Sequence, residues 1–123
     1  MKLKPKDIPT MRAELLAINN GHCALCKEPV RDPCLDHSHA TGLCRDTVCR
    51  SCNSALGRIE NLTRYGVRDA ITFARLAADY LEEHLRHPSS MVHPAYRTED
   101  ERKALAKKRR ARKAKLKRTK PFK

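Results

Sequence analysis

The chain has little from which to build a hydrophobic core. It contains no tryptophan, only two phenylalanines and three tyrosines, and four glycines among its 123 residues. No apolar run is long enough for a membrane span or a secretory signal. We therefore expect a small aliphatic core, no membrane partner and a cytoplasmic location.

Acidic residues are scarce relative to basic ones, and the net charge is +13. The excess is concentrated at one end, because residues 98–123 hold 13 Lys/Arg against 3 Asp/Glu. This charge favours a polyanionic partner, most simply a nucleic acid. Six cysteines in a reducing compartment are read as metal ligands before disulfides.

The composition divides the chain into four segments. They are a basic arm over residues 1–9, a metal-bound core over 10–62, a long helix with a proline-containing linker over 63–97, and a basic tail over 98–123. Within the core, Thr10 is expected to cap a helix that ends near Asn20, with Gly21 in the left-handed conformation.

Two short strands are predicted within residues 34–48, around a turn at Ala40–Gly42, followed by a short helix over about 53–61. The longest helix is predicted over about 67–87, where apolar residues form two adjacent stripes. The first stripe is Val67, Ala70, Ile71, Ala74, Ala77, Ala78, Leu81 and Leu85, and the second is Phe73, Leu76 and Tyr80. Both stripes can line a monomer core, but the core has few elements to cover two faces. We therefore favour contact of the second stripe with another subunit in a homodimer.

In the tail, Thr98 and Glu101 predict a capping box for a helix over 103–120. Because this helix is charged on nearly every face, we expect it to be frayed or disordered until phosphates neutralise it. A solubilising tail is the simpler interpretation, but the charge density favours DNA binding. The candidate DNA contacts in the tail are Lys107, Lys108, Arg109, Arg110, Arg112 and Lys113.

Two CxxC pairs, Cys23/Cys26 and Cys49/Cys52, are separated by 22 residues. Four thiolates at this spacing are the ligand set of a structural zinc ion. Cys34 and Cys44 remain, on either side of the turn, where they would face each other across the two strands. We interpret them as small buried side chains; a second metal held by these cysteines with the two histidines between them is the alternative.

Asp36, His37, His39 and Asn53 are the remaining chemically capable residues of this region. Carboxylate and amide oxygens are hard ligands, so Asp36 and Asn53 suit Mg²⁺ or Mn²⁺. His37 is the candidate general base for an attacking water, and His39 would contact the phosphate or assist the attack. Neighbouring strand residues point to opposite faces, so a common site for Asp36 and His37 requires a bulge or strand end near residues 36–38.

These motifs resemble the phage recombination endonuclease VII family, which belongs to the His-Me finger (HNH-like) nucleases with a ββα-metal core. The resemblance rests on CALC, LDHSHATG, R-x-x-x-C-R-x-C-N, S-A-L-G and HPAY, and covers roughly residues 10–97. It assigns zinc to the four CxxC cysteines, magnesium to Asp36 and Asn53, and the general base to His37. It also aligns His39 with the second histidine and Arg45, a further candidate DNA contact, with the arginine of the second strand. Ser38 stands where an acidic residue is common, and Asp46 where glycine is common.

The sequence thus predicts an α+β, mostly helical fold, with a ββα-metal core stabilised by a structural zinc ion. A long dimerisation helix and a basic tail follow this core. The expected activity is Mg-dependent endonuclease cleavage of branched DNA, such as Holliday junctions, by a dimer in the cytoplasm, which is the host cytoplasm if the chain is phage-encoded. A nicking or homing endonuclease on duplex DNA is the alternative within the enzymes. A non-catalytic zinc module that binds nucleic acid is the alternative outside them.

Overall fold

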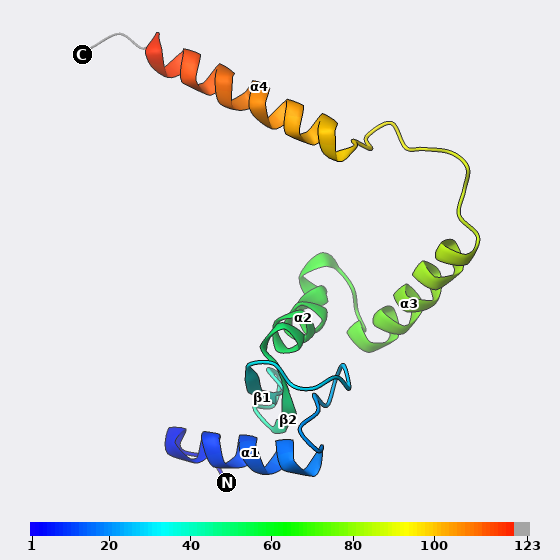
Figure 1. Cartoon of the computed structure of the whole chain (residues 1–123). Helices are drawn as coiled ribbons and strands as arrows, with labels where there is room; N and C mark the ends of the chain where they lie inside the picture. The colour runs from blue at the N-terminus through cyan, green and yellow to red at the C-terminus, as the bar shows by residue number, and fades with distance from the viewer. Residues whose placement is uncertain (120–123) are drawn as a thin grey trace. The chain divides into compact units, whose positions relative to one another are not determined.

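The computed structural model describes residues 1–119 and divides the chain into two units, Met1–Glu83 and His84–Lys123 (Figure 1). The elements are η1 (Pro5–Asp7), α1 (Ile8–Ile18), β1 (Pro33–His37), β2 (Cys44–Cys49), α2 (Arg50–Glu60), η2 (Asn61–Tyr65), α3 (Ala70–Arg86) and α4 (Glu99–Arg118). The predicted α+β, mostly helical class is confirmed, and β1, β2 and α2 follow one another as the expected ββα unit.

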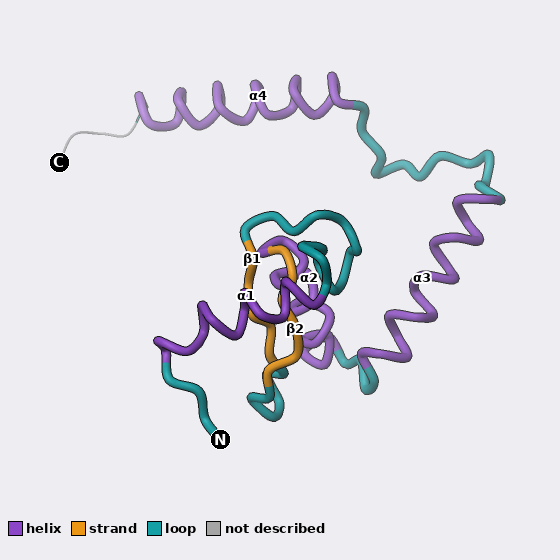
Figure 2. Tube along the Cα trace, turned by 60° about the horizontal axis from the view of Figure 1, so that its bottom comes forward, coloured by secondary structure: helices purple, strands orange, loops and turns teal. Residues whose placement is uncertain are grey.

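Helix α1 begins at Ile8, so the prediction that Thr10 caps it is wrong. Pro9 stands in the first turn, where a missing N–H leaves no hydrogen bond unmade, and the helix can therefore start before Thr10. The predicted end is confirmed, because Gly21 has a φ of +77°. The helix contacts both strands of the hairpin (Figure 2).

The two strands pair antiparallel, and the loop of residues 38–43 connects them. Gly42, with a φ of +74°, lies in this loop, and its N–H donates to the Ser38 carbonyl oxygen at 2.7 Å. The register is irregular between Leu35 and His37, which confirms the predicted bulge. Between the pairs Leu35–Thr47 and His37–Cys44, β2 contributes Arg45 and Asp46 opposite Asp36 alone, so the extra residue lies in β2 and β1 ends at His37.

The register also corrects the expected pairing of Cys34 with Cys44. Cys34 lies opposite Val48, and Cys44 lies opposite His37. The turn is centred between residues 40 and 41, which is closer to Cys44 than to Cys34. The two cysteines therefore do not occupy opposite positions in the sheet. Neither is fully buried.

The buried core of the described residues is small. Its apolar members are Cys23, Val48 and Cys49, and its polar members are Asp36 and Thr47. Two side-chain bonds connect α1 and its C-cap residue, Asn19, to β2. The Thr47 hydroxyl donates to the Arg12 carbonyl oxygen at 2.8 Å, and the Asn19 amide donates to Asp46 Oδ1 at 2.8 Å. Asp46 therefore helps to hold α1 against β2.

Helix α2 begins at Arg50, three residues before the predicted start, and α3 lies within the range predicted for the longest helix. The longest helix is α4, with 20 residues against 17 for α3, so that prediction is wrong. Both apolar stripes of α3 expose their large side chains: Ile71, Phe73, Leu76, Tyr80, Leu81 and Leu85 are between 44% and 81% accessible. The expectation of a monomer core along these stripes is not met in the single chain.

The second unit contains α4, which starts with the predicted capping box. Thr98 accepts from the Glu101 N–H, and the Glu101 carboxylate accepts from the Thr98 N–H. The helix ends at Arg118, and Lys120, the predicted end, lies outside the described residues. Between residues 1 and 119, no helix combines the length and apolar character that crossing a membrane requires.

Candidate active site and zinc centre

The four CxxC cysteines converge on one point. Their Sγ atoms all lie within 4.8 Å of one another. Tetrahedral zinc–thiolate geometry places sulfur atoms about 3.8 Å apart, so this cluster fits a structural zinc ion. Cys49 ends β2 and Cys52 lies in the first turn of α2, and the cluster therefore fixes the hairpin against that helix. In the described chain it is the only such group of three or more Cys, His or acidic side chains, so the alternative second metal site is not formed.

Backbone N–H groups in this cluster stabilise the thiolate form of Cys23. Burial acts to raise the pKa of Cys23, but bonds from the N–H groups of Cys26, Cys49 and Leu25 outweigh it and lower that pKa to about 6. The Cys49 N–H lies 3.3 Å from Cys23 Sγ. Burial, followed by bonds with Cys26 and Cys23, raises the pKa of Cys52 to about 12. A metal ion that binds all four thiolates must therefore release a proton from Cys52.

Asp36 is held by an arginine from the opposite strand. Its side chain is 7% exposed, and its Oδ2 and Oδ1 atoms accept from Arg45 Nε at 2.6 Å and Nη2 at 3.0 Å. Arg45 Nη2 also donates to the His37 carbonyl oxygen at 3.1 Å and to Glu60 Oε1 at 2.5 Å. These bonds, to Asp36 first and then to Glu60, raise the pKa of Arg45 above its usual value. The resulting charge cluster joins β1, β2 and α2.

The two histidines of the DHSH run lie together at the end of β1. Their ring centroids are 5.2 Å apart, and the rings are tilted by 50°. His39 lies against α2, where a Cβ at Gly57 would be 3.9 Å from its Cε1 atom. Gly57 therefore leaves room for the His39 ring beside the helix.

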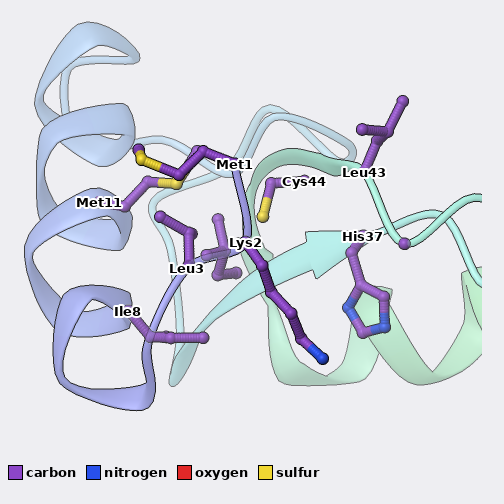
Figure 3. A pocket seen from close by; sticks show the side chains of 10 residues that line it. Met1, Lys2, Leu3, Ile8, Met11, His37, Leu43 and Cys44 are labelled. Carbon is purple, nitrogen blue, oxygen red and sulfur yellow. The ribbon is translucent and has the colours of Figure 1, made fainter.

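His37 lines a hollow of about 380 Å³ beneath the N-terminal arm (Figure 3). The walls come from residues 1–3, α1 and the hairpin, and include Leu3, Ile8 and Met11. Lys2 also lines the hollow, and in Figure 3 its side chain extends beside that of His37. Asp36 lines a different hollow, together with Val48, Arg45 and Leu56. The structure thus brings His37 to His39 and Asp36 to Arg45, but Asp36 and His37 do not share a hollow.

Asn53 lies on the half-buried stripe of α2. The members of this stripe are Cys52, Asn53, Leu56, Gly57 and Glu60. Two of them touch the hairpin site, since Gly57 faces His39 and Glu60 bonds Arg45. Helical spacing places Asn53 on the same side, one and two turns before these residues.

The family model for recombination endonuclease VII matches residues 2–83, which is two thirds of the chain. The matched range includes all four clustered cysteines and the DHSH run. The chain belongs to the recombination endonuclease VII family. A search of curated proteins found no match.

Membership of the endonuclease VII family implies a nuclease that acts on DNA. The match covers η1 through most of α3 and leaves α4 outside. The six candidate DNA contacts of the tail all lie on α4, where they are exposed. Arg45 is the exception among the proposed DNA contacts, because its side chain is engaged within the site.

Glu60 is a site residue that the sequence pattern did not reveal. It has no place in the CxxC or DHSH motifs, and it looks like one of many charged helix residues. The available signal was its spacing, because Glu60 follows Asn53 by seven residues and so lies two turns along the same face.

Proposed function

We propose that this member of the endonuclease VII family is a metal-dependent endonuclease that cleaves branched DNA, such as Holliday junctions, as a homodimer. The observation that carries the proposal is the position of the DHSH run. It lies at the end of β1, opposite a bulge in β2, and against an α2 helix that the four-cysteine cluster fixes to the hairpin. A nuclease needs this kind of rigid support for its reacting groups.

Asp36 and Asn53 are the residues that would hold a Mg²⁺ or Mn²⁺ ion. Their donors are hard oxygens, and Asp36 is nearly buried, which fits a cation site better than a surface acid. When bound, the ion supplies positive charge that stabilises the leaving 3′ oxygen. Zinc in the cysteine cluster has a structural role only.

His37 takes the role of general base. It is exposed, so a water molecule and a DNA strand can reach its ring. The imidazole accepts a proton from water as the water oxygen bonds to phosphorus and the P–O3′ bond breaks. His39, in ring contact with His37, binds a phosphate oxygen, and Lys2 beside the same hollow adds positive charge.

The exposed apolar stripe of α3 supports the homodimer. Phe73, Leu76 and Tyr80 are each more than 40% accessible in the single chain. Contiguous exposed apolar side chains of this size mark interaction surfaces. Two active sites in one dimer match the chemistry of a branched junction, in which two strands must be cut.

Helix α4 supports binding without sequence preference. Its cations are exposed, and such side chains bind phosphates through salt-sensitive, sequence-independent contacts. Deletion of this helix is therefore expected to weaken DNA binding more than it slows the chemical step.

Cleavage of immobile four-way junctions and matched linear duplexes, with Mg²⁺ or with EDTA, tests the proposal. We expect junction cleavage with Mg²⁺ and several orders of magnitude less in His37→Ala, with DNA binding intact. His87→Ala, at an exposed histidine after α3, is the matched control and should cleave normally. Equal rates on junction and duplex would indicate a nicking or homing enzyme. Binding without cleavage of any DNA would indicate a non-catalytic module.

A further inference from the structure

The Arg45 guanidinium is hydrogen-bonded to the carboxylate of Asp36, to which the proposed function assigns a metal ion. Both oxygens of Asp36 accept from it, at 2.6 and 3.0 Å, and the Asp36 side chain is only 7% exposed. Paired hydrogen bonds between a guanidinium and a carboxylate are among the strongest side-chain contacts in proteins. A divalent cation can therefore take these oxygens only when Arg45 gives them up.

Glu60 offers a second acceptor to Arg45 when Arg45 leaves Asp36. It accepts from Arg45 Nη2 at 2.5 Å and is 27% exposed, on the rim of the site. An Asp–Arg pair alone would be neutral and would attract a divalent cation weakly. With Glu60 the cluster carries a net charge of −1, and Arg45 keeps an acceptor after it leaves Asp36.

We propose that Arg45 is an internal counter-cation that a divalent metal ion displaces from Asp36, and that Glu60 is the positioning residue that retains the displaced guanidinium beside the site. The inference rests on the proposed role of Asp36 as a metal ligand. It goes beyond that role by giving Glu60 a function and by making Arg45 a competitor of the metal ion.

The exposure of Arg45 indicates where its side chain goes when it is displaced. The Arg45 side chain is 38% exposed, so it can turn toward solvent without crossing the core. A DNA phosphate that accepts from the displaced guanidinium lowers the cost of displacement. Metal and DNA therefore bind more tightly together than apart, and each favours the other by the same factor.

Titration of the zinc-loaded full chain with Mn²⁺, without DNA, tests the competition directly. Unbound Mn²⁺ is measured by electron paramagnetic resonance. Hydrogen bonds to charged groups contribute about 1.5–3 kcal/mol, so Arg45→Gln is expected to bind Mn²⁺ about ten- to a hundredfold more tightly than the wild type. Arg50→Gln is the matched control, because it breaks an exposed Arg–Asp pair with Asp32 and should leave the affinity unchanged.

The variants separate this inference from the proposed function. If the wild type and Arg45→Gln bind no Mn²⁺, or if Asp36→Asn binds as the wild type does, the proposed metal site fails. If Asp36→Asn abolishes binding but Arg45→Gln leaves it unchanged or weakens it, the site stands and the competition is refuted.

Glu60→Gln tests the positioning role. We expect it to weaken Mn²⁺ binding in the wild type, because the displaced Arg45 has lost its second acceptor. In the Arg45→Gln background the same substitution should have a smaller effect. Equal weakening in both backgrounds would make Glu60 a direct contributor to the metal site and would refute its action through Arg45.

A spectroscopic measurement on the wild type avoids dependence on variants that fold poorly. The ¹⁵N–¹H signal of Arg45 Nε, assigned by its loss in Arg45→Lys, should shift as Mg²⁺ saturates the site. The Nε signal of Arg50 should not move. Saturation by Mg²⁺ with an unchanged Arg45 signal would refute displacement.

Discussion

Removal of zinc is expected to unfold the ββα unit. Among the described residues, Val48 is the one fully buried aliphatic side chain, and burial of such a side chain stabilises by about 1.5–3 kcal/mol. Structural zinc contributes about 10–16 kcal/mol in small zinc-binding peptides. Since a domain of this kind has a total stability of about 5–15 kcal/mol, the cluster accounts for most or all of it.

The assay must report on the hairpin itself, because α3 and α4 dominate the helical circular dichroism signal. The amide signals of Thr47 and Val48 in ¹⁵N–¹H spectra are suitable, since both residues are buried in β2. We expect these signals to collapse to unfolded positions when a zinc chelator is added, and in Cys49→Ser. Cys34→Ser, at a cysteine outside the cluster, should keep them. Dispersed Thr47 and Val48 signals in zinc-free protein would refute the reasoning.

Three further predictions concern the helices. Replacement of Phe73 and Leu76 by glutamate should turn the proposed dimer into a monomer in analytical ultracentrifugation, because charge cannot be buried along the α3 stripe; an unchanged mass would place the interface elsewhere. Deletion of residues 98–123 should flatten the dependence of DNA affinity on salt, measured by fluorescence anisotropy, and retention of the full slope would remove α4 from the binding surface. Bonds from Thr72, first from its hydroxyl and then from its N–H, lower the pKa of Asp69 at the start of α3. The contribution of this carboxylate is therefore complete above the unfolded pKa of about 3.9 and is lost as the pH falls through the lower folded value. Asp69→Ala should make amide exchange of Thr72 severalfold faster at neutral pH, and should remove its acid dependence.

The sequence predicted those features that depend on local chemistry. The spacing of the two CxxC pairs predicted the cluster, since only a few geometries allow four thiolates to reach one ion. Gly21 predicted the end of α1, and Thr98 with Glu101 predicted the start of α4. The bulge was predicted from a functional requirement, and it is found opposite Asp36, with the extra residue in β2.

Features that depend on register and tertiary contact were not predicted. The pairing of Cys34 was wrong because the position of the turn, and not the spacing of the cysteines, sets the register. The bonds from Arg45 to Asp36 and to Glu60 could not be predicted without knowing which strand and helix residues meet. The roles of Asp36, His37 and Asn53 in catalysis stay predictions, as does the division of the chain into four segments.

Gly57 offers a practical handle on this nuclease. A methyl group at this position would make ordinary van der Waals contact with the His39 ring, whereas a longer side chain would push the ring away from α2. A series of substitutions at Gly57 from alanine to leucine would therefore shift the His39 ring progressively. None of these substitutions replaces a charged residue or a cysteine. Such a series would yield intact proteins of decreasing cutting power, suited to trapping DNA in the uncut state.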